Sequence, residues 1–258
     1  MPQRPTRSLR HEYQLYVEQE IENYKESIPR HVLLGIGDEA VAVLEKQMQF
    51  TLTELLVWEE VDRLIFRRLR LPSYTAWCGK RLQLLAELRR PEHWTMTADA
   101  GVVRDVGGAS ETQVLVAGAP DATSTLYLAA NGCNVTALET EPDAVERVLH
   151  AAVEAGLTER VHACIGHLAS WSPNERLSAV IVMPSALSGL TSEERARVIA
   201  ELQSATIDGG VHLVQTIAAT GKRALTLEEL RSTYRGWSVT VERSDGKPKV
   251  FLARKGAA

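Results

Sequence analysis

The amino-acid sequence predicts an α/β protein in which a mostly parallel sheet ends in an antiparallel hairpin and is preceded by an all-helical N-terminal domain. Up to about residue 94, apolar residues recur at the three- and four-residue spacing of helices. From about residue 111, short apolar runs alternate with amphipathic stretches, which is typical of a parallel sheet covered by helices. Near the C-terminus, Asp245-Gly246 separates two strand-like runs and predicts a tight hairpin. We therefore expect two domains, residues 1–94 and 95–258.

The N-terminal domain is expected to contain three helices or more. The spacing of aromatic and apolar residues from Tyr13 to Tyr24 predicts a first helix that stops before Pro29. Asp38 is a candidate N-cap for a long second helix, with a break near residue 50 where threonines lower the helix propensity. Ser73 is the expected N-cap of a third helix that runs to about Arg90, before Pro91.

The second domain is expected to hold five parallel strands, then a helix and a hairpin. The five strands are predicted at residues 114–118, 134–139, 160–166, 178–184 and 210–217, and the helices between them are expected to begin near Thr123, Pro142 and Thr191. A helix over 225–234 precedes the hairpin strands 237–244 and 247–255, which must be antiparallel because a tight turn joins them. Residues 95–110 read as a connector with one short helix.

Bulk composition limits the classes of function. The formal net charge is -4, and basic and acidic residues are nearly balanced in the first hundred positions, so no nucleic-acid partner is expected. No apolar run approaches the roughly 18 residues of a membrane span, and no secretion signal is visible, so we expect a cytoplasmic protein without a membrane partner. Cys78, Cys133 and Cys164 are widely spaced and form no metal-ligand pattern.

The first predicted strand ends in a turn suited to close approach by a ligand. In an open parallel sheet, ligands bind beyond the carboxyl ends of the strands, where the strand order reverses. Gly118 stands at such an end, and Asp121 and Thr123 are candidate caps of the following helix. An ordinary strand-to-helix turn also needs one glycine, so both interpretations stay open.

The ends of the next three strands supply further candidates. Glu139 lies about twenty residues beyond Gly118, the spacing of an acid that accepts hydrogen bonds from a ribose diol. The alternative is an exposed acid at the start of a polar loop, with Glu141 as a competitor. His167 follows the third strand, where it could contact a base or be a surface residue, and Met183 ends the fourth strand.

These features together resemble the class I S-adenosylmethionine-dependent methyltransferases, which have a Rossmann-like fold, over roughly residues 95–256. The segment "VLVAGAPDA" is similar to the first motif of that family, "VTALETEPDAVERV" to its second and "AVIVMPSAL" to its fourth. The segment "LTLEELRSTYRGWSVTVE" is similar to the closing stretch of many small-molecule members, including tellurite-resistance-type methyltransferases. The resemblance implies S-adenosylmethionine as cofactor and S-adenosylhomocysteine as product. The implied cofactor-binding residues are Ala117, Gly118, Ala119, Pro120, Asp121, Glu139, Thr140, His167, Leu168 and Met183.

The sequence also departs from the pattern of the family. Val116 replaces the acid that commonly precedes the first motif glycine, Pro120 and Ala122 replace the second and third glycines, and His167 replaces the usual acid of the third loop. Pro120 removes one N–H donor from the turn that would hold the amino-acid end of the cofactor. Asp121 is a candidate replacement that would bind the ligand's ammonium group.

Two functions are therefore expected as alternatives. The first is methyl transfer to a small-molecule or peptide-sized acceptor, with no catalytic residue identified and no metal required. The second is a non-catalytic scaffold or regulatory protein with a degenerate cofactor site. The helical domain would cover the site, shape the acceptor pocket or mediate assembly, and the apolar residues between Phe50 and Phe66 make a homodimer an alternative to packing within one chain.

Overall fold

The computed structural model describes residues 8–47, 54–98, 100–106, 111–119, 122–215, 226–244 and 247–256. The chain divides into two compact units, Met1–Leu84 and Leu85–Ala258. The division therefore falls ten residues before the expected domain boundary, because Leu85 and Leu88 pack into the core of the second unit. Each unit is described by itself.

The first unit consists of helices packed around a small apolar core. Its helices are α1 (Leu9–Ser27), α2 (Arg30–Gln47), α3 (Glu54–Leu69) and the first part of α4 (Tyr74–Leu88). The fully buried members of the core come from α2 and α3 and include Ile36, Val61 and Ile65. The hydroxyl oxygens of Ser8 and Ser73 accept hydrogen bonds from His11 N and Ala76 N, so the expected cap at Ser73 is confirmed.

The expected start of the second helix at Asp38 is wrong. Helix α2 begins at Arg30, and Asp38 lies inside it. The carbonyl oxygen of Pro29 accepts hydrogen bonds from Val32 N and Leu33 N, so proline stands at the helix start, where its missing N–H costs nothing. The expected break near residue 50 lies outside the described residues, between the end of α2 and the start of α3.

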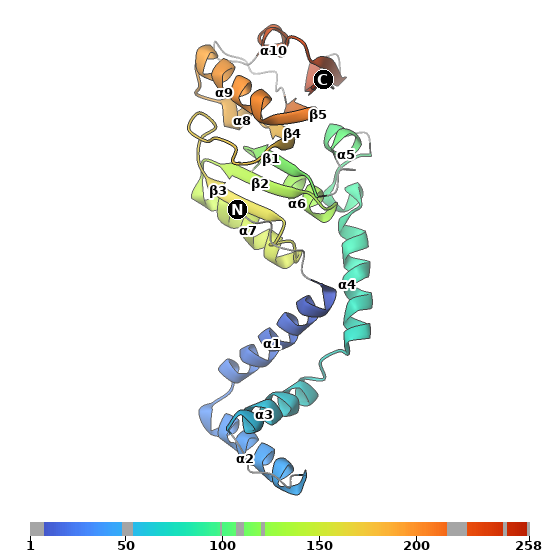
Figure 1. Ribbon diagram of the computed structural model, residues 1–258, viewed down its shortest axis with the longest axis vertical. Helices are drawn as coiled ribbons and strands as arrows, with labels where there is room; N and C mark the ends of the chain where they lie inside the picture. The colour runs from blue at the N-terminus through green and yellow to red at the C-terminus, as the bar shows by residue number, and fades with distance from the viewer. Residues whose placement is uncertain are drawn as a thin grey trace. The chain divides into compact units, whose positions relative to one another are not determined.

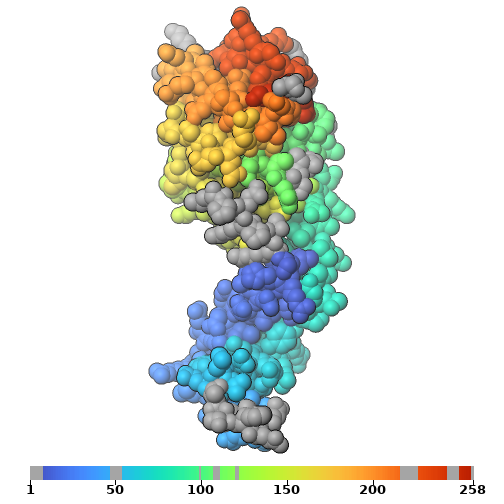
Figure 2. Space-filling view, in the orientation of Figure 1, coloured from blue at the N-terminus to red at the C-terminus, as the bar shows by residue number. Residues whose placement is uncertain are grey.

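The second unit is a seven-stranded sheet covered by helices (Figure 1). Its strands are β1 (Gln113–Ala117), β2 (Asn134–Glu139), β3 (Val161–Ile165), β4 (Leu177–Val182), β5 (Thr206–Gln215), β6 (Ser238–Ser244) and β7 (Lys247–Arg254). The helices are η1 (Pro91–Trp94), α5 (Gly101–Asp105), α6 (Thr123–Ala130), α7 (Pro142–Glu154), α8 (Pro184–Leu187), α9 (Ser192–Ala205) and α10 (Leu227–Thr233). The yellow-to-red part of the chain, which contains β3 to β7, forms much of the face of this unit seen in Figure 2.

The strand order is β3-β2-β1-β4-β5-β7-β6. Strands β1 to β5 pair in parallel, and β7 pairs antiparallel with both β5 and β6. The predicted fold class is therefore confirmed. The last strand of the chain lies inside the sheet, and the strand before it forms the edge.

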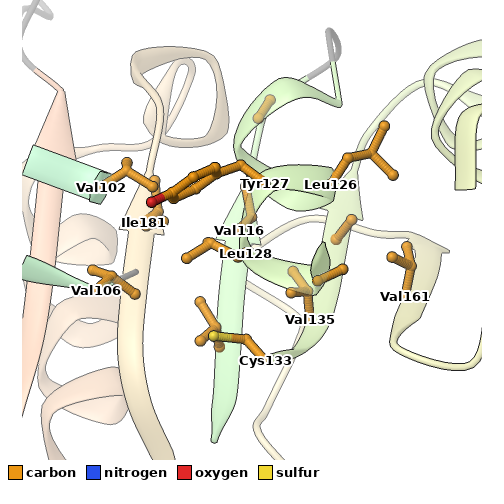
Figure 3. Close-up of a cluster of buried hydrophobic side chains, with 14 of the residues drawn as sticks. Val102, Val106, Val116, Leu126, Tyr127, Leu128, Cys133, Val135, Val161 and Ile181 are labelled. Atoms are coloured by element: carbon orange, nitrogen blue, oxygen red, sulfur yellow. The ribbon is translucent and has the colours of Figure 1, made fainter. Parts of the chain in front are cut away.

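The sheet buries both faces, as its near-continuous apolar strands require. Val114 and Val116 of β1 join a cluster with α5, α6 and α7, and Leu115 and Ala117 join a second cluster with α8, α9 and α10. Figure 3 shows the first cluster, in which the ring of Tyr127 points from α6 towards α5 and β4. Among the described residues, no helix combines the length and apolar character that crossing a bilayer demands.

A buried polar network ties the C-terminal half of the sheet to its helices. Thr206 Oγ1 donates to the carbonyl oxygen of Leu202 at 2.7 Å, so it accepts from His212 Nε2 at 2.8 Å. His212 Nδ1 then accepts from the Tyr234 hydroxyl at 2.7 Å. His212 is 0% exposed, and burial, with a smaller effect of the Lys255 charge, lowers its pKa from 6.5 to about 3. The imidazole is therefore a neutral structural link between β5 and α10.

We expect this histidine to make the protein sensitive to acid. Below pH 6.5 the unfolded chain binds a proton at His212 that the folded chain excludes, so stability falls as pH is lowered towards about 3. Relative to His212→Asn, the wild-type protein should lose about 1.4 kcal/mol of unfolding free energy per pH unit over this range. Urea unfolding at several pH values measures the difference.

The matched control is His150→Asn, because the His150 side chain is 75% exposed. It should show the same slope as the wild-type protein. Equal slopes in wild type and His212→Asn would show that His212 is not held neutral by the fold.

Candidate functional site

A cleft of about 140 Å³ lies at the carboxyl ends of β1, β2 and β3. The end of β2 and helix α7 line it with Leu138, Glu139, Thr140, Glu141, Ala144 and Arg147. Gly166 and Leu168 contribute from the segment after β3, and Gly118, Ser185 and Ala186 from the segments after β1 and β4. The cleft therefore lies on the edge of the sheet where the sequence placed a ligand.

Main-chain hydrogen bonds align the strand ends around this cleft. Gly118 N donates to the carbonyl oxygen of Leu138 at 3.0 Å, and Gly166 N donates to that of Glu139 at 2.8 Å. On the other side, Met183 N donates to the carbonyl oxygen of Ala117 at 2.9 Å. These bonds continue the parallel ladders beyond the strands, so the residues that follow β1, β2, β3 and β4 are held at one level.

Glu139 is the buried acid of the site. It is the last residue of β2, only 5% exposed, and it lines the cleft. The alternative of an exposed acid that starts a polar loop is therefore wrong for Glu139, although it fits Glu141, which is exposed. A buried carboxylate beside an open space is suited to accept hydrogen bonds from ligand hydroxyl groups.

Gly118 is required by the protein's own packing. Its φ is +75°, and the Ser185 hydroxyl donates to its carbonyl oxygen at 2.8 Å. A Cβ atom at this position would lie 2.5 Å from Ser185 Oγ and 2.9 Å from Ala186 N. Helix α8 thus packs directly against Gly118.

The turn between β1 and α6 differs from its expected form. Ala122, with φ +57°, is the N-cap of α6 and its carbonyl oxygen accepts from Leu126 N, so Thr123 is already helical and is not the cap. Pro120 and Asp121, including the predicted ammonium contact of Asp121, lie outside the described residues.

The remaining predicted positions divide into three groups. Thr140 and Leu168 line the cleft together with Gly118 and Glu139. Ala117 and Ala119 are buried at 0% and 2% exposure and belong to the hydrophobic core. His167 is exposed and Met183 is half-buried, and neither is among the residues that line the cleft.

The sequence analysis did not identify Arg147, and it did not predict the contact of Ser185 and Ala186 with Gly118. Arg147 follows Ala144 by three residues on α7, so the helical period brings both to the same face. Ser185 and Ala186 lie in the segment "AVIVMPSAL", but their contact with Gly118 depends on the pairing of β1 with β4, which no local pattern predicts.

The cleft combines apolar walls with a few charged groups. Leu138 and Leu168 are buried, and the ionisable residues that line it are Glu139, Glu141 and Arg147. Within the described ranges, no three His, Cys, Asp or Glu side chains are grouped so that they could hold a metal ion. The cleft is therefore suited to a ligand with an apolar ring, which Leu138 and Leu168 would contact, and with hydroxyl groups, which Glu139 would bind.

We expect Gly118→Ala to lower the free energy of unfolding by more than the strain of a left-handed backbone alone would do. The control is Gly236→Ala, where φ is +87° and no atom lies within 4 Å of the added Cβ. The control should cost about 1–2 kcal/mol from the left-handed backbone alone. Gly118→Ala should cost about 1–3 kcal/mol more, because the Cβ meets Ser185 and Ala186. Chemical denaturation of both variants measures this difference, and equal losses would show that α8 does not pack on Gly118.

Comparison with solved structures confirms the fold. TehB from Haemophilus influenzae superposes with a TM-score of 0.51 at 17% identity, over 64% of this chain and 65% of that chain. The [4+2]-cyclase SpnF superposes with a TM-score of 0.51 at 18% identity, over 61% of this chain and 79% of that chain. At these identities the likeness concerns the fold, which is the Rossmann-like fold expected for the second domain.

Comparison of the sequence with known proteins identifies a family but no curated relative. No curated protein sequence gives a significant match to the chain. The family model described as "Tellurite resistance protein TehB" matches residues 91–245, which is more than half of the chain. The match includes β1 to β5, the cleft and α8. This chain therefore belongs to the TehB family.

Proposed function

We propose that this protein binds S-adenosylmethionine at the cleft and transfers its methyl group to a small-molecule or peptide-sized acceptor. The observation that carries the proposal is the buried Glu139 carboxylate at the end of β2, beside an open space between the ends of β2 and β3. An acid at this place is suited to hold the two hydroxyls of a ribose. The family and the fold support the same cofactor.

The residues around Glu139 fit the adenosine part of this cofactor. Leu138 and Leu168 offer apolar walls for a base, and the backbone at Gly166 allows close approach. The cofactor supplies an activated methyl group on a sulfonium. The protein's own contribution is to hold the ribose, orient the ligand and exclude water, and positioning of this kind accounts for much of the rate of such a transfer. A general base is needed only when the acceptor must lose a proton.

The amino-acid part of the cofactor fits less well. Ser185 and Ala186 lie over Gly118, and the cleft of about 140 Å³ is smaller than the roughly 300–1,000 Å³ of common ligand pockets. This observation favours a second candidate function, a non-catalytic member that binds a nucleoside as a regulatory or structural ligand. SpnF, a cyclase on a similar fold, illustrates that the fold alone does not set the reaction.

The identity of the methyl acceptor is the more specific part of the proposal. The description of the family names tellurite resistance, so the tellurite oxyanion is the first acceptor to test.

The helical unit is a candidate surface for dimer formation, because Leu34, Leu55 and Trp58 expose 61%, 68% and 46% of their surface. A homodimer through this unit stays a prediction.

We expect Glu139→Gln to weaken binding of S-adenosylhomocysteine by about 10- to 100-fold, because hydrogen bonds to a charged acceptor contribute about 1.5–3 kcal/mol. Glu141→Gln is the control, since Glu141 lines the same cleft but is exposed. Isothermal titration calorimetry measures both affinities. Equal affinities for Glu139→Gln and the wild-type protein would mean that the ribose is held elsewhere.

Turnover distinguishes the two candidate functions. If the protein is a methyltransferase, S-adenosylhomocysteine should accumulate when it is incubated with S-adenosylmethionine and tellurite, and Glu139→Gln should slow this at sub-saturating cofactor. Chromatographic detection of the product gives the rate. Ligand binding without product, for tellurite and for a panel of small amines, thiols and peptides, would favour the non-catalytic candidate.

A further inference from the structure

Strand β3 forms a free edge of the sheet. It stands at one end of the strand order, with α7 packed beside it, and among the described residues it pairs only with β2 (Figure 1). Gly166 N and the carbonyl oxygen of Arg160 bond to β2. Because a parallel ladder uses the main-chain groups of alternate residues, those of Val161, Ala163 and Ile165 point to the free edge. Such groups are a template for the addition of another strand.

The two edges of the sheet differ in their protection against such addition. Edge strands are commonly blocked by charged residues, prolines or bulges. At the other edge, the pairing of β6 is irregular between Glu242 and Arg243, which are both charged. Strand β3 reads "VHACI", with no proline, aspartate, glutamate, lysine or arginine, and it pairs with β2 without a bulge. The β3 edge therefore carries none of these three features.

Exposed apolar side chains gather at the same edge. The described part of the second unit has four exposed large hydrophobic residues, and three of them are Leu149 and Val153 of α7 and Ile165 of β3. They expose 41%, 64% and 60% of their surface. Leu149 and Val153 each directly follow a buried residue of α7, so both lie on the same flank of its buried face. In a right-handed crossover from β2 to β3, that flank faces the free edge.

This edge is complementary to a second copy of itself. When two β3 strands run antiparallel about Ala163, Val161 of each faces Ile165 of the other, and each outward N–H group meets an outward carbonyl. The two α7 helices then lie on the same face of one continuous sheet, where Leu149 and Val153 of both copies cover each other. A lone strand from another protein would pair with β3 but would leave these side chains exposed.

We propose that the β3 edge and the adjoining flank of α7 form a homodimer interface through which the sheets of two chains join. The interface does not depend on the proposed function, because Leu149, Val153 and Ile165 are not among the residues that line the cleft. It is also distinct from the exposed surface of the helical unit. The two surfaces can therefore be tested against each other.

The test is sedimentation velocity over a range of concentrations. The edge variant combines Val153→Lys with Ile165→Lys, which places cations on both sides of the interface at exposed positions. Ile207→Lys is the matched control, because Ile207 is exposed by 39% on β5, in the same unit. A variant with Leu34→Lys and Leu55→Lys probes the helical unit instead.

The wild-type chain should sediment as a dimer that dissociates on dilution. The edge variant should raise the dissociation constant at least about 100-fold, because like charges across an interface are strongly unfavourable. Ile207→Lys and the helical-unit variant should leave it within about 2-fold. A wild-type chain that is monomeric at every concentration overturns the proposal, and so does a dimer that the edge variant leaves intact.

Hydrogen exchange of the wild-type protein checks the pairing without any substitution. The amides of Val161, Ala163 and Ile165 should exchange at least about 10-fold more slowly in concentrated than in dilute protein, because the dimer closes their edge. The amides of β6 should exchange equally at both concentrations. If a dimer forms and exchange in β3 stays unchanged, the interface lies elsewhere and the proposal is overturned.

Discussion

Parallel pairing of β1 with both β2 and β4 is the constraint on which the site depends. The two ladders match Leu115 with Thr136 on one side and with Val180 on the other, so three strand ends arrive at one level. The ladders are buried on both faces, which leaves the strands no freedom to slide. Gly118, Glu139 and Met183 are placed by this pairing, although they are far apart in the sequence.

The same pairing explains why the first turn can carry so few glycines. Gly118 is needed where α8 approaches the backbone, with the Ser185 hydroxyl on its carbonyl oxygen. At Ala122 the backbone is also left-handed, with φ +57°, and a small alanine adopts it where a larger side chain would be costly. Gly118 and Ala122 are thus suited to contacts and backbone geometry within the protein itself.

The C-terminal half of the second unit is rigidified by polar groups that the cleft does not use. Arg195 of α9 is 4% exposed and makes two hydrogen bonds to the Glu229 carboxylate of α10, at 2.8 and 3.2 Å. His212 links β5 to α10 through Tyr234. Burial makes both links specific in geometry, because a misplaced partner would leave a buried polar group unsatisfied. These contacts stabilise the position of β5 against the helices. Helix α8 has four residues and lies in the chain between β4 and α9.

Local patterns in the sequence were sufficient for the order of strands and helices, the hairpin and the position of Glu139 at a strand end, because the two-residue and 3.6-residue periods and the turn residues act within a few positions. They failed at Asp38, because helix α2 already begins at Arg30, directly after Pro29. They also failed at Thr123, because Ala122 is the left-handed N-cap of α6. The insertion of β7 between β5 and β6, the burial of Glu139 and the placement of Ser185 over Gly118 were decided only in the tertiary structure. Each of these depends on which distant strands become neighbours, and that is set by packing of the whole sheet.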